Sequence, residues 1–170
     1  MGKFLQMLPN KIDSLAKKLG QQLKQKQWTI SCAESCTGGG VAFAITSVAG
    51  SSDWFKQSFV TYSNEAKQVL LGVRQEVLMS SGAVSDHTVE QMASGCALKS
   101  AAEVGVSISG IAGPDGGSDD KPVGLVWFGF FVKGKVTTKK QIFNGDRHQV
   151  RGLAIEYALQ QCSELITEHE

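Results

Sequence analysis

Strand-like apolar runs alternate with helical patterns along this sequence. Residues 28–33, 55–63 and 104–109 are rich in apolar and β-favouring residues and predict strands. The segments around them carry apolar residues at helical spacing. The predicted helices cover residues 10–26, 37–48, 65–72, 75–80, 88–102 and 146–166. This alternation favours parallel strands with helices packed on both faces of the sheet.

A hairpin is predicted after the third strand. Residues 123–132 and 136–143 have strand patterns, and the short connection Lys133-Gly134-Lys135 between them is typical of a tight antiparallel turn. The sequence therefore predicts the α/β class, as a three-layer α/β/α sandwich with a mixed, partly parallel sheet and a C-terminal hairpin.

Polar residues that favour helix N-termini precede three of the predicted helices. Asn64 is the expected cap of the helix that ends near Gly72, either Ser85 or Asp86 caps the helix at 88–102, and Asp146 begins the last one.

The size and charge of the chain narrow the kinds of ligand that it is expected to bind. The 170 residues, of which 42% are hydrophobic, suffice for one sizeable core, so we expect a single domain over residues 1–170. Seventeen basic and sixteen acidic residues give a net charge of +1. Since no basic excess favours a nucleic-acid partner, we expect a small-molecule ligand.

The sequence gives no sign of a membrane segment or an oxidising compartment. No apolar run approaches the roughly 20 residues of a membrane helix, and residues 1–18 lack the continuous apolar segment of a signal peptide. We expect a cytoplasmic protein in which Cys32, Cys36, Cys96 and Cys162 are reduced and buried. No zinc site is expected, because no pair of histidines accompanies Cys32 and Cys36.

Unusual polar residues follow three of the predicted strands. They are Glu34-Ser35-Cys36-Thr37-Gly38-Gly39, Tyr62-Ser63-Asn64-Glu65-Ala66-Lys67, and Ser109 with the loop 110–117. Ligands of open α/β sheets bind beyond the carboxyl ends of the strands. We therefore expect these three segments to converge on one site.

Ser35 is the candidate nucleophile of that site. It lies where a strand turns into a helix, and backbone N–H groups at a helix start can bind an oxyanion or a phosphate. The alternative is structural, since small residues also serve simply to turn the chain. Cys36 is a rival nucleophile, because a thiolate beside a helix start is activated.

A serine hydroxyl needs a base, and the histidines of this sequence are poor candidates. His87 and His148 lie near helix starts, where a surface role is the alternative, and His169 lies near the C-terminus. Lys67, one helical turn after Asn64, is the better candidate if burial lowers its pKa. Its alternative role is that of a solvated helix lysine.

Several segments of the sequence resemble the CinA C-terminal domain family. They are AESCTGG at 33–39, TYSNEAK at 61–67, GAVS at 82–85, SISGIAGPDGG at 107–117, KPVG at 121–124 and GDR at 145–147. The resemblance runs from about residue 12 to residue 165. Stand-alone members of the family include nicotinamide mononucleotide deamidases.

The resemblance implies hydrolysis of the carboxamide of nicotinamide mononucleotide to nicotinate mononucleotide and ammonia, in pyridine nucleotide recycling. It also implies a serine–lysine site without a metal or cofactor, and a homodimer or higher homo-oligomer. Ser35 would be the nucleophile, Lys67 the general base and Tyr62 a proton relay or a group that orients the lysine. The donors to the oxyanion or the ligand would come from Thr37, Gly38 and Gly39.

Other residues are candidates for binding the substrate. Arg147 can grip the 5′-phosphate, or else pair with Asp146 or another surface acid. Asn64 and Ser109 can bind ribose or amide groups, or serve as cap and turn residues. In the loop 110–117, Gly110 and Gly113 would let the backbone approach a ligand, although the loop can also simply reverse the chain.

Two other functions and one structural question remain open at this point. The chain could be a non-catalytic nucleotide-binding regulatory module, or an amidase for a different small amide or nucleotide. Trp54, Phe55 and Trp127 could form an interface between copies or belong to the core.

Overall fold

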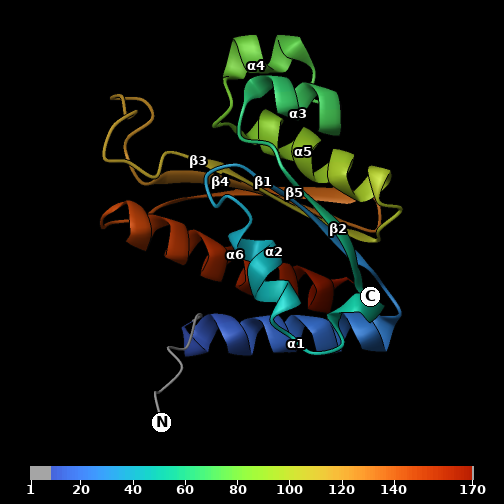
Figure 1. The fold of residues 1–170 in the computed structure, drawn as a ribbon. Helices are drawn as coiled ribbons and strands as arrows, with labels where there is room; N and C mark the ends of the chain where they lie inside the picture. The colour runs from blue at the N-terminus through green and yellow to red at the C-terminus, as the bar shows by residue number, and fades with distance from the viewer. Residues whose placement is uncertain (1–8, 170) are drawn as a thin grey trace.

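The structure, a computed structural model, describes residues 9–169 (Figure 1). Its strands are β1 (Ile30–Glu34), β2 (Phe55–Val60), β3 (Val104–Gly110), β4 (Leu125–Val132) and β5 (Lys135–Ile142). Its helices are α1 (Asn10–Lys26), α2 (Gly40–Thr46), α3 (Asn64–Leu71), α4 (Gln75–Ser81), α5 (Asp86–Lys99) and α6 (Arg147–Glu168), with a 3-10 turn η1 at Ser51–Asp53. The N-terminal residues 1–8, part of the segment in which no signal peptide was expected, lie outside the described range.

The strands form one mixed sheet in the order β2-β1-β3-β4-β5. β1 runs parallel to both β2 and β3, whereas β4 is antiparallel to its neighbours β3 and β5. In this register Glu34, the last residue of β1, pairs with Val60 of β2 and Ile108 of β3. The carboxyl ends of three strands therefore meet at one edge of the sheet.

Helices cover both faces of the sheet, so the predicted three-layer α/β/α sandwich is confirmed (Figure 1). α5 packs on one face, and α3 and α4 pack against α5. On the other face lie α6 and α2, with α1 packed against both of them. Among the described residues, no helix is long and apolar enough to cross a membrane.

The apolar residues form two clusters, one on each face of the sheet. All five residues of β1 are buried between them, as its continuous apolar pattern predicts. Trp54 is buried in the larger cluster, and Phe55 and Trp127 pack against the clusters, so these three residues belong to the core. The four cysteines are buried and free, as predicted.

The structure corrects two details near the strand ends. The helix predicted at 37–48 begins only at Gly40, because Gly38 and Gly39 take the left-handed backbone conformation (φ +60° and +101°) and form a turn instead. Ser63, not Asn64, caps α3, since its side chain accepts the N–H of Ala66. Ser85 caps α5, and Asp146 caps α6 with a reciprocal bond to Gln149.

Candidate active site

A cavity of about 280 Å³ lies at the edge of the sheet where β1, β2 and β3 end. All three predicted polar segments contribute to it, and α6 adds one further side chain. The predicted site residues that line the cavity are Ser35, Tyr62, Lys67, Ser109, Gly110, Gly113 and Arg147. Convergence of the three strand ends, which the fold class alone predicted, is therefore observed.

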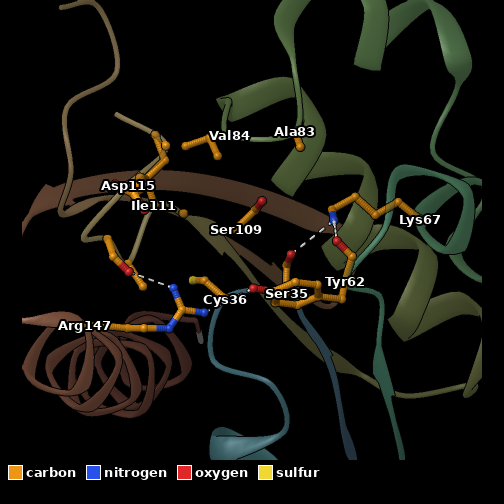
Figure 2. Close-up of a pocket in the computed structure, with 14 residues that line it drawn as sticks. Ser35, Cys36, Tyr62, Lys67, Ala83, Val84, Ser109, Ile111, Asp115 and Arg147 are labelled. Atoms are coloured by element: carbon orange, nitrogen blue, oxygen red, sulfur yellow. Dashed lines mark hydrogen bonds between the residues drawn. The ribbon is translucent and has the colours of Figure 1, made fainter. Parts of the chain in front are cut away.

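Ser35 and Lys67 are direct neighbours in this cavity (Figure 2). The Nζ atom of Lys67 lies 3.1 Å from the Oγ atom of Ser35, 2.7 Å from the carbonyl oxygen of Thr61 and 3.4 Å from that of Tyr62. Lys67 is only 1% exposed, so it is not the solvated helix lysine of the alternative interpretation. Its amine is held between a hydroxyl and two carbonyl groups.

Burial changes the protonation of Lys67. Removal from water disfavours the charged form and lowers the pKa of Lys67 to about 8. Among the described residues, no carboxylate forms an ion pair with this amine to restore its charge. A neutral amine next to the serine is therefore accessible near physiological pH.

The Cys36 thiol also borders the cavity, but its environment differs from that of an activated thiolate. Burial raises the pKa of Cys36 to about 12, because the surroundings disfavour the charged thiolate. The helix α2 begins only at Gly40, so Cys36 does not occupy its first turn. The thiol is held in its neutral form.

Arg147 forms the opposite side of the cavity from Lys67 (Figure 2). Its Nη1 donates to the carbonyl oxygen of Gly113 over 2.8 Å, and its Nη2 donates to the hydroxyl of Tyr62 over 3.2 Å. The Tyr62 side chain is thus bound to the arginine, whereas only its backbone carbonyl approaches Lys67. Arg147 does not pair with Asp146, whose carboxylate caps α6.

A buried carboxylate for which the sequence predicted no individual role organises the turn around Ser35. Glu34 is fully buried, and its two oxygens accept the hydroxyl of Thr37 and the backbone N–H groups of Val41 and Ala42, at 2.6, 2.8 and 3.0 Å. The carboxylate thereby occupies the N-terminal end of α2. In the sequence, the available signal was its position directly after a predicted buried strand, at the start of the first polar segment.

Four predicted binding residues lie outside the cavity. Thr37, Gly38 and Gly39 line a separate hollow of about 490 Å³ between α1, α2 and α6. The hydroxyl of Thr37 is bound to Glu34, and the N–H of Gly38 donates to the carbonyl of Ser35, so both groups are already engaged. Asn64 is exposed at the start of α3.

An arginine that was not predicted supports the same turn from the outside. Arg151 of α6 donates from Nε to the carbonyl of Cys36 over 3.0 Å, and from Nη2 to that of Thr37 over 3.3 Å. The turn is therefore held between the Glu34 carboxylate and the Arg151 guanidinium.

The histidines lie away from the serine–lysine pair. His87 contacts the carboxylate of Asp86 on the surface, and His148 lines the separate hollow. Within residues 9–169, no group of three His, Cys, Asp or Glu side chains is arranged to hold a metal ion. The lysine is thus the titratable group that contacts Ser35.

The chain is similar to nicotinamide-nucleotide amidohydrolases of other organisms over nearly its whole length. It is 54% identical over 155 residues to the nicotinamide-nucleotide amidohydrolase PncC of Enterobacter agglomerans, covering 91% of this chain and 94% of that one. It is 45% identical over 157 residues to the protein of the same name from Pseudomonas putida, covering 92% and 98% of the two chains.

Solved structures match in fold as well. The competence damage-inducible protein A of Klebsiella pneumoniae superposes with a TM-score of 0.92 at 37% identity, covering 95% of this chain and all of that one. A competence/damage inducible protein of Agrobacterium tumefaciens gives the same TM-score at 39% identity, over 98% and 100% of the chains. A sequence model of the CinA C-terminal domain matches residues 12–166, and the chain belongs to the CinA C-terminal domain family.

Proposed function

We propose that this protein is a nicotinamide-nucleotide amidohydrolase that uses Ser35 as its nucleophile and Lys67 as its general base. The observation that carries the proposal is the 3.1 Å contact between the Ser35 hydroxyl and a buried lysine whose pKa is lowered to about 8. The names of the relatives from E. agglomerans and P. putida support the substrate class.

The contacts of Lys67 suit a neutral amine. A neutral amine has two N–H bonds and one lone pair, and the carbonyls of Thr61 and Tyr62 accept the two N–H groups. The lone pair is then directed to Ser35, and it takes the hydroxyl proton as Oγ bonds to the amide carbon of the substrate. The carbonyl electrons of the amide move to its oxygen.

The lysine also returns the proton. Collapse of the tetrahedral intermediate breaks the C–N bond, and the Lys67 ammonium protonates the leaving nitrogen to give ammonia. Water then attacks the ester on Ser35 while Lys67 accepts a proton from the water. The nicotinate carboxyl group leaves as the proton returns to Ser35, so the enzyme is restored.

Arg147 is suited to the phosphate of the substrate. A guanidinium has five N–H groups, and two of them are used by Gly113 and Tyr62 in this structure. Among the described residues, no hydrogen bond engages the other three, which can bind phosphate oxygens with the well-defined geometry of arginine. In this arrangement Tyr62 orients the arginine, and the amide of the substrate lies at the opposite end of the cavity, beside Ser35.

The test is ammonia release from nicotinamide mononucleotide, measured with a chelator present. We expect turnover by the wild type, a loss of about three orders of magnitude or more in Ser35→Ala, and retention of most activity in Cys36→Ala. The reverse pattern in the two variants would contradict the serine assignment. A folded wild type that binds the nucleotide without releasing ammonia would indicate a binding module instead.

A further inference from the structure

One wall of the cavity is a loop that is closed at its base. Backbone hydrogen bonds from Ile111 N to Leu125 O, at 2.9 Å, and from Gly124 N to Ile111 O, at 2.7 Å, close the loop over residues 112–123. Four residues of the loop line the cavity, namely Ala112, Gly113, Asp115 and Gly116. The position of this loop therefore sets the width of the cavity.

Beyond its base, the loop is connected to other elements by hydrogen bonds from two cationic side chains, Arg147 and Lys121. In the described part of the chain, Arg147 of α6 donates from Nη1 to the carbonyl oxygen of Gly113 in the loop. Lys121 of the loop donates from Nζ to the carbonyl oxygen of Ser81 in α4, over 2.7 Å. Ser81 is the last residue of α4, and Ala83 and Val84, which follow it, also line the cavity. Lys121 thus connects two walls of the cavity to each other.

The local structure fits this role of Lys121. A closed turn presents the residue, because Ser118 N donates to Lys121 O at 2.8 Å and Lys121 N donates to Ser118 Oγ at 3.1 Å. On the opposite wall, Gly82 has a φ of +78°, and a Cβ atom there would lie 3.0 Å from Lys121 Nζ. Glycine at this position provides both the backbone conformation and the room for the ammonium group.

We infer that Lys121 is a positioning residue that fixes the separation of these two walls, and thereby the binding of the nucleotide. Lys121 does not line the cavity, and it lies on the loop 112–123, whereas Ser35 lies on the turn after β1 and Lys67 lies on α3. Its loss therefore affects substrate binding and not the proton transfers. The inference rests on the proposed function for the identity of the nucleotide.

The kinetic test compares Lys121→Met, which keeps most of the stem and removes the donors, with Lys121→Arg and with the exposed control Lys18→Met on α1. For nicotinamide mononucleotide we expect KM to rise about tenfold in Lys121→Met, because this variant loses one charge-assisted hydrogen bond between the two walls. The kcat value and its pH profile should stay unchanged. Lys121→Arg should restore most of the binding, and Lys18→Met should match the wild type.

Hydrogen exchange tests the inference without relying on turnover. Backbone amides of residues 112–123 should exchange faster in Lys121→Met than in the wild type, while the exchange of α1 and α6 stays the same. If the wild type releases no ammonia, the proposed function fails, and faster exchange at 112–123 still supports the role of Lys121. Unchanged exchange in this loop, or a fall in kcat with unchanged KM, would overturn the inference.

Discussion

Lys67 combines a charged residue type with a location that disfavours charge. Its amine is buried, and the pKa of about 8 means that roughly one tenth of it is neutral at pH 7. Desolvation by burial, which opposes the charged form, is also what makes this side chain usable as a base. The three oxygen atoms around the amine accept hydrogen bonds in its charged form, and two of them suffice in its neutral form.

The protonation of Lys67 predicts the pH dependence of catalysis. Because only the neutral amine accepts the Ser35 proton, kcat/KM should rise about tenfold per pH unit below pH 8 and level off above it. Ammonia release measured from pH 6 to pH 9.5 checks this. The Lys18→Met variant, altered at an exposed position of α1, which does not line the cavity, should give the same profile as the wild type. A kcat/KM value that is already constant from pH 6 would contradict the role of Lys67 as a base.

Single residues also show how far the sequence predicted the candidate site. Ser35, Lys67 and Ser109 were predicted because they follow strands whose carboxyl ends share one edge of the sheet. Glu34 belongs to the first of the three polar segments, but its role was not predicted, because its partners Val41 and Ala42 become neighbours only through the conformation of the intervening turn. The same turn places Thr37, Gly38 and Gly39 in the separate hollow and not in the cavity. Their positions in the sequence did not indicate this.

At the level of elements, the strands and most helices were predicted to within a few residues, and the exceptions have local causes. Glycines at 38 and 39 read as the weak start of a helix, whereas their positive φ values separate the strand from α2. The turn that results presents Ser35 to the cavity. It is held in place by the carboxylate of Glu34, whose oxygens accept donors from both the turn and the helix.

The Glu34→Gln variant tests this support. A neutral amide has one acceptor oxygen in place of two, so a buried donor loses its partner and the remaining bonds lose their charge assistance. The free energy of unfolding should fall by about 2–3 kcal/mol, and kcat should fall as the turn loosens. Urea unfolding and ammonia release measure the two effects. If the exposed control Glu90→Gln loses as much stability, the proposal that the Glu34 carboxylate holds the turn in place is wrong.

At the level of the whole molecule, the serine and the lysine come from different layers. Ser35 follows a strand of the central sheet, whereas Lys67 lies on α3, which packs against α5 on one face of that sheet. The distance between the two side chains therefore depends on how closely α3 approaches α5. The sequence could not predict this distance, because Gly95 within α5 reads only as a residue of low helix propensity. In the structure, Gly95 faces the carbonyl of Leu71 at the end of α3.

Two glycine-to-alanine substitutions in helices should have opposite effects. At Gly95, an added Cβ atom would overlap the carbonyl oxygen of Leu71, so α3 must move. Gly95→Ala should lower the free energy of unfolding by about 1–3 kcal/mol and slow ammonia release by displacing Lys67. At Gly152 in α6, no atom of the described residues lies within 4 Å of the added Cβ, apart from the chain neighbours and the backbone of the helix itself, and alanine should stabilise the protein by about 0.5–1 kcal/mol.

Urea unfolding of the two variants, with kcat measured on each, separates packing from helix propensity. Helix propensity alone favours alanine at both positions. If the free energy of unfolding falls in Gly95→Ala but rises in Gly152→Ala, the difference therefore comes from the contact between α5 and α3. Retained activity in Gly152→Ala together with a reduced kcat in Gly95→Ala would show that the close approach of α3 positions the lysine. Equal stabilisation by both substitutions, with unchanged kcat, would show that the Ser35–Lys67 distance does not depend on this contact.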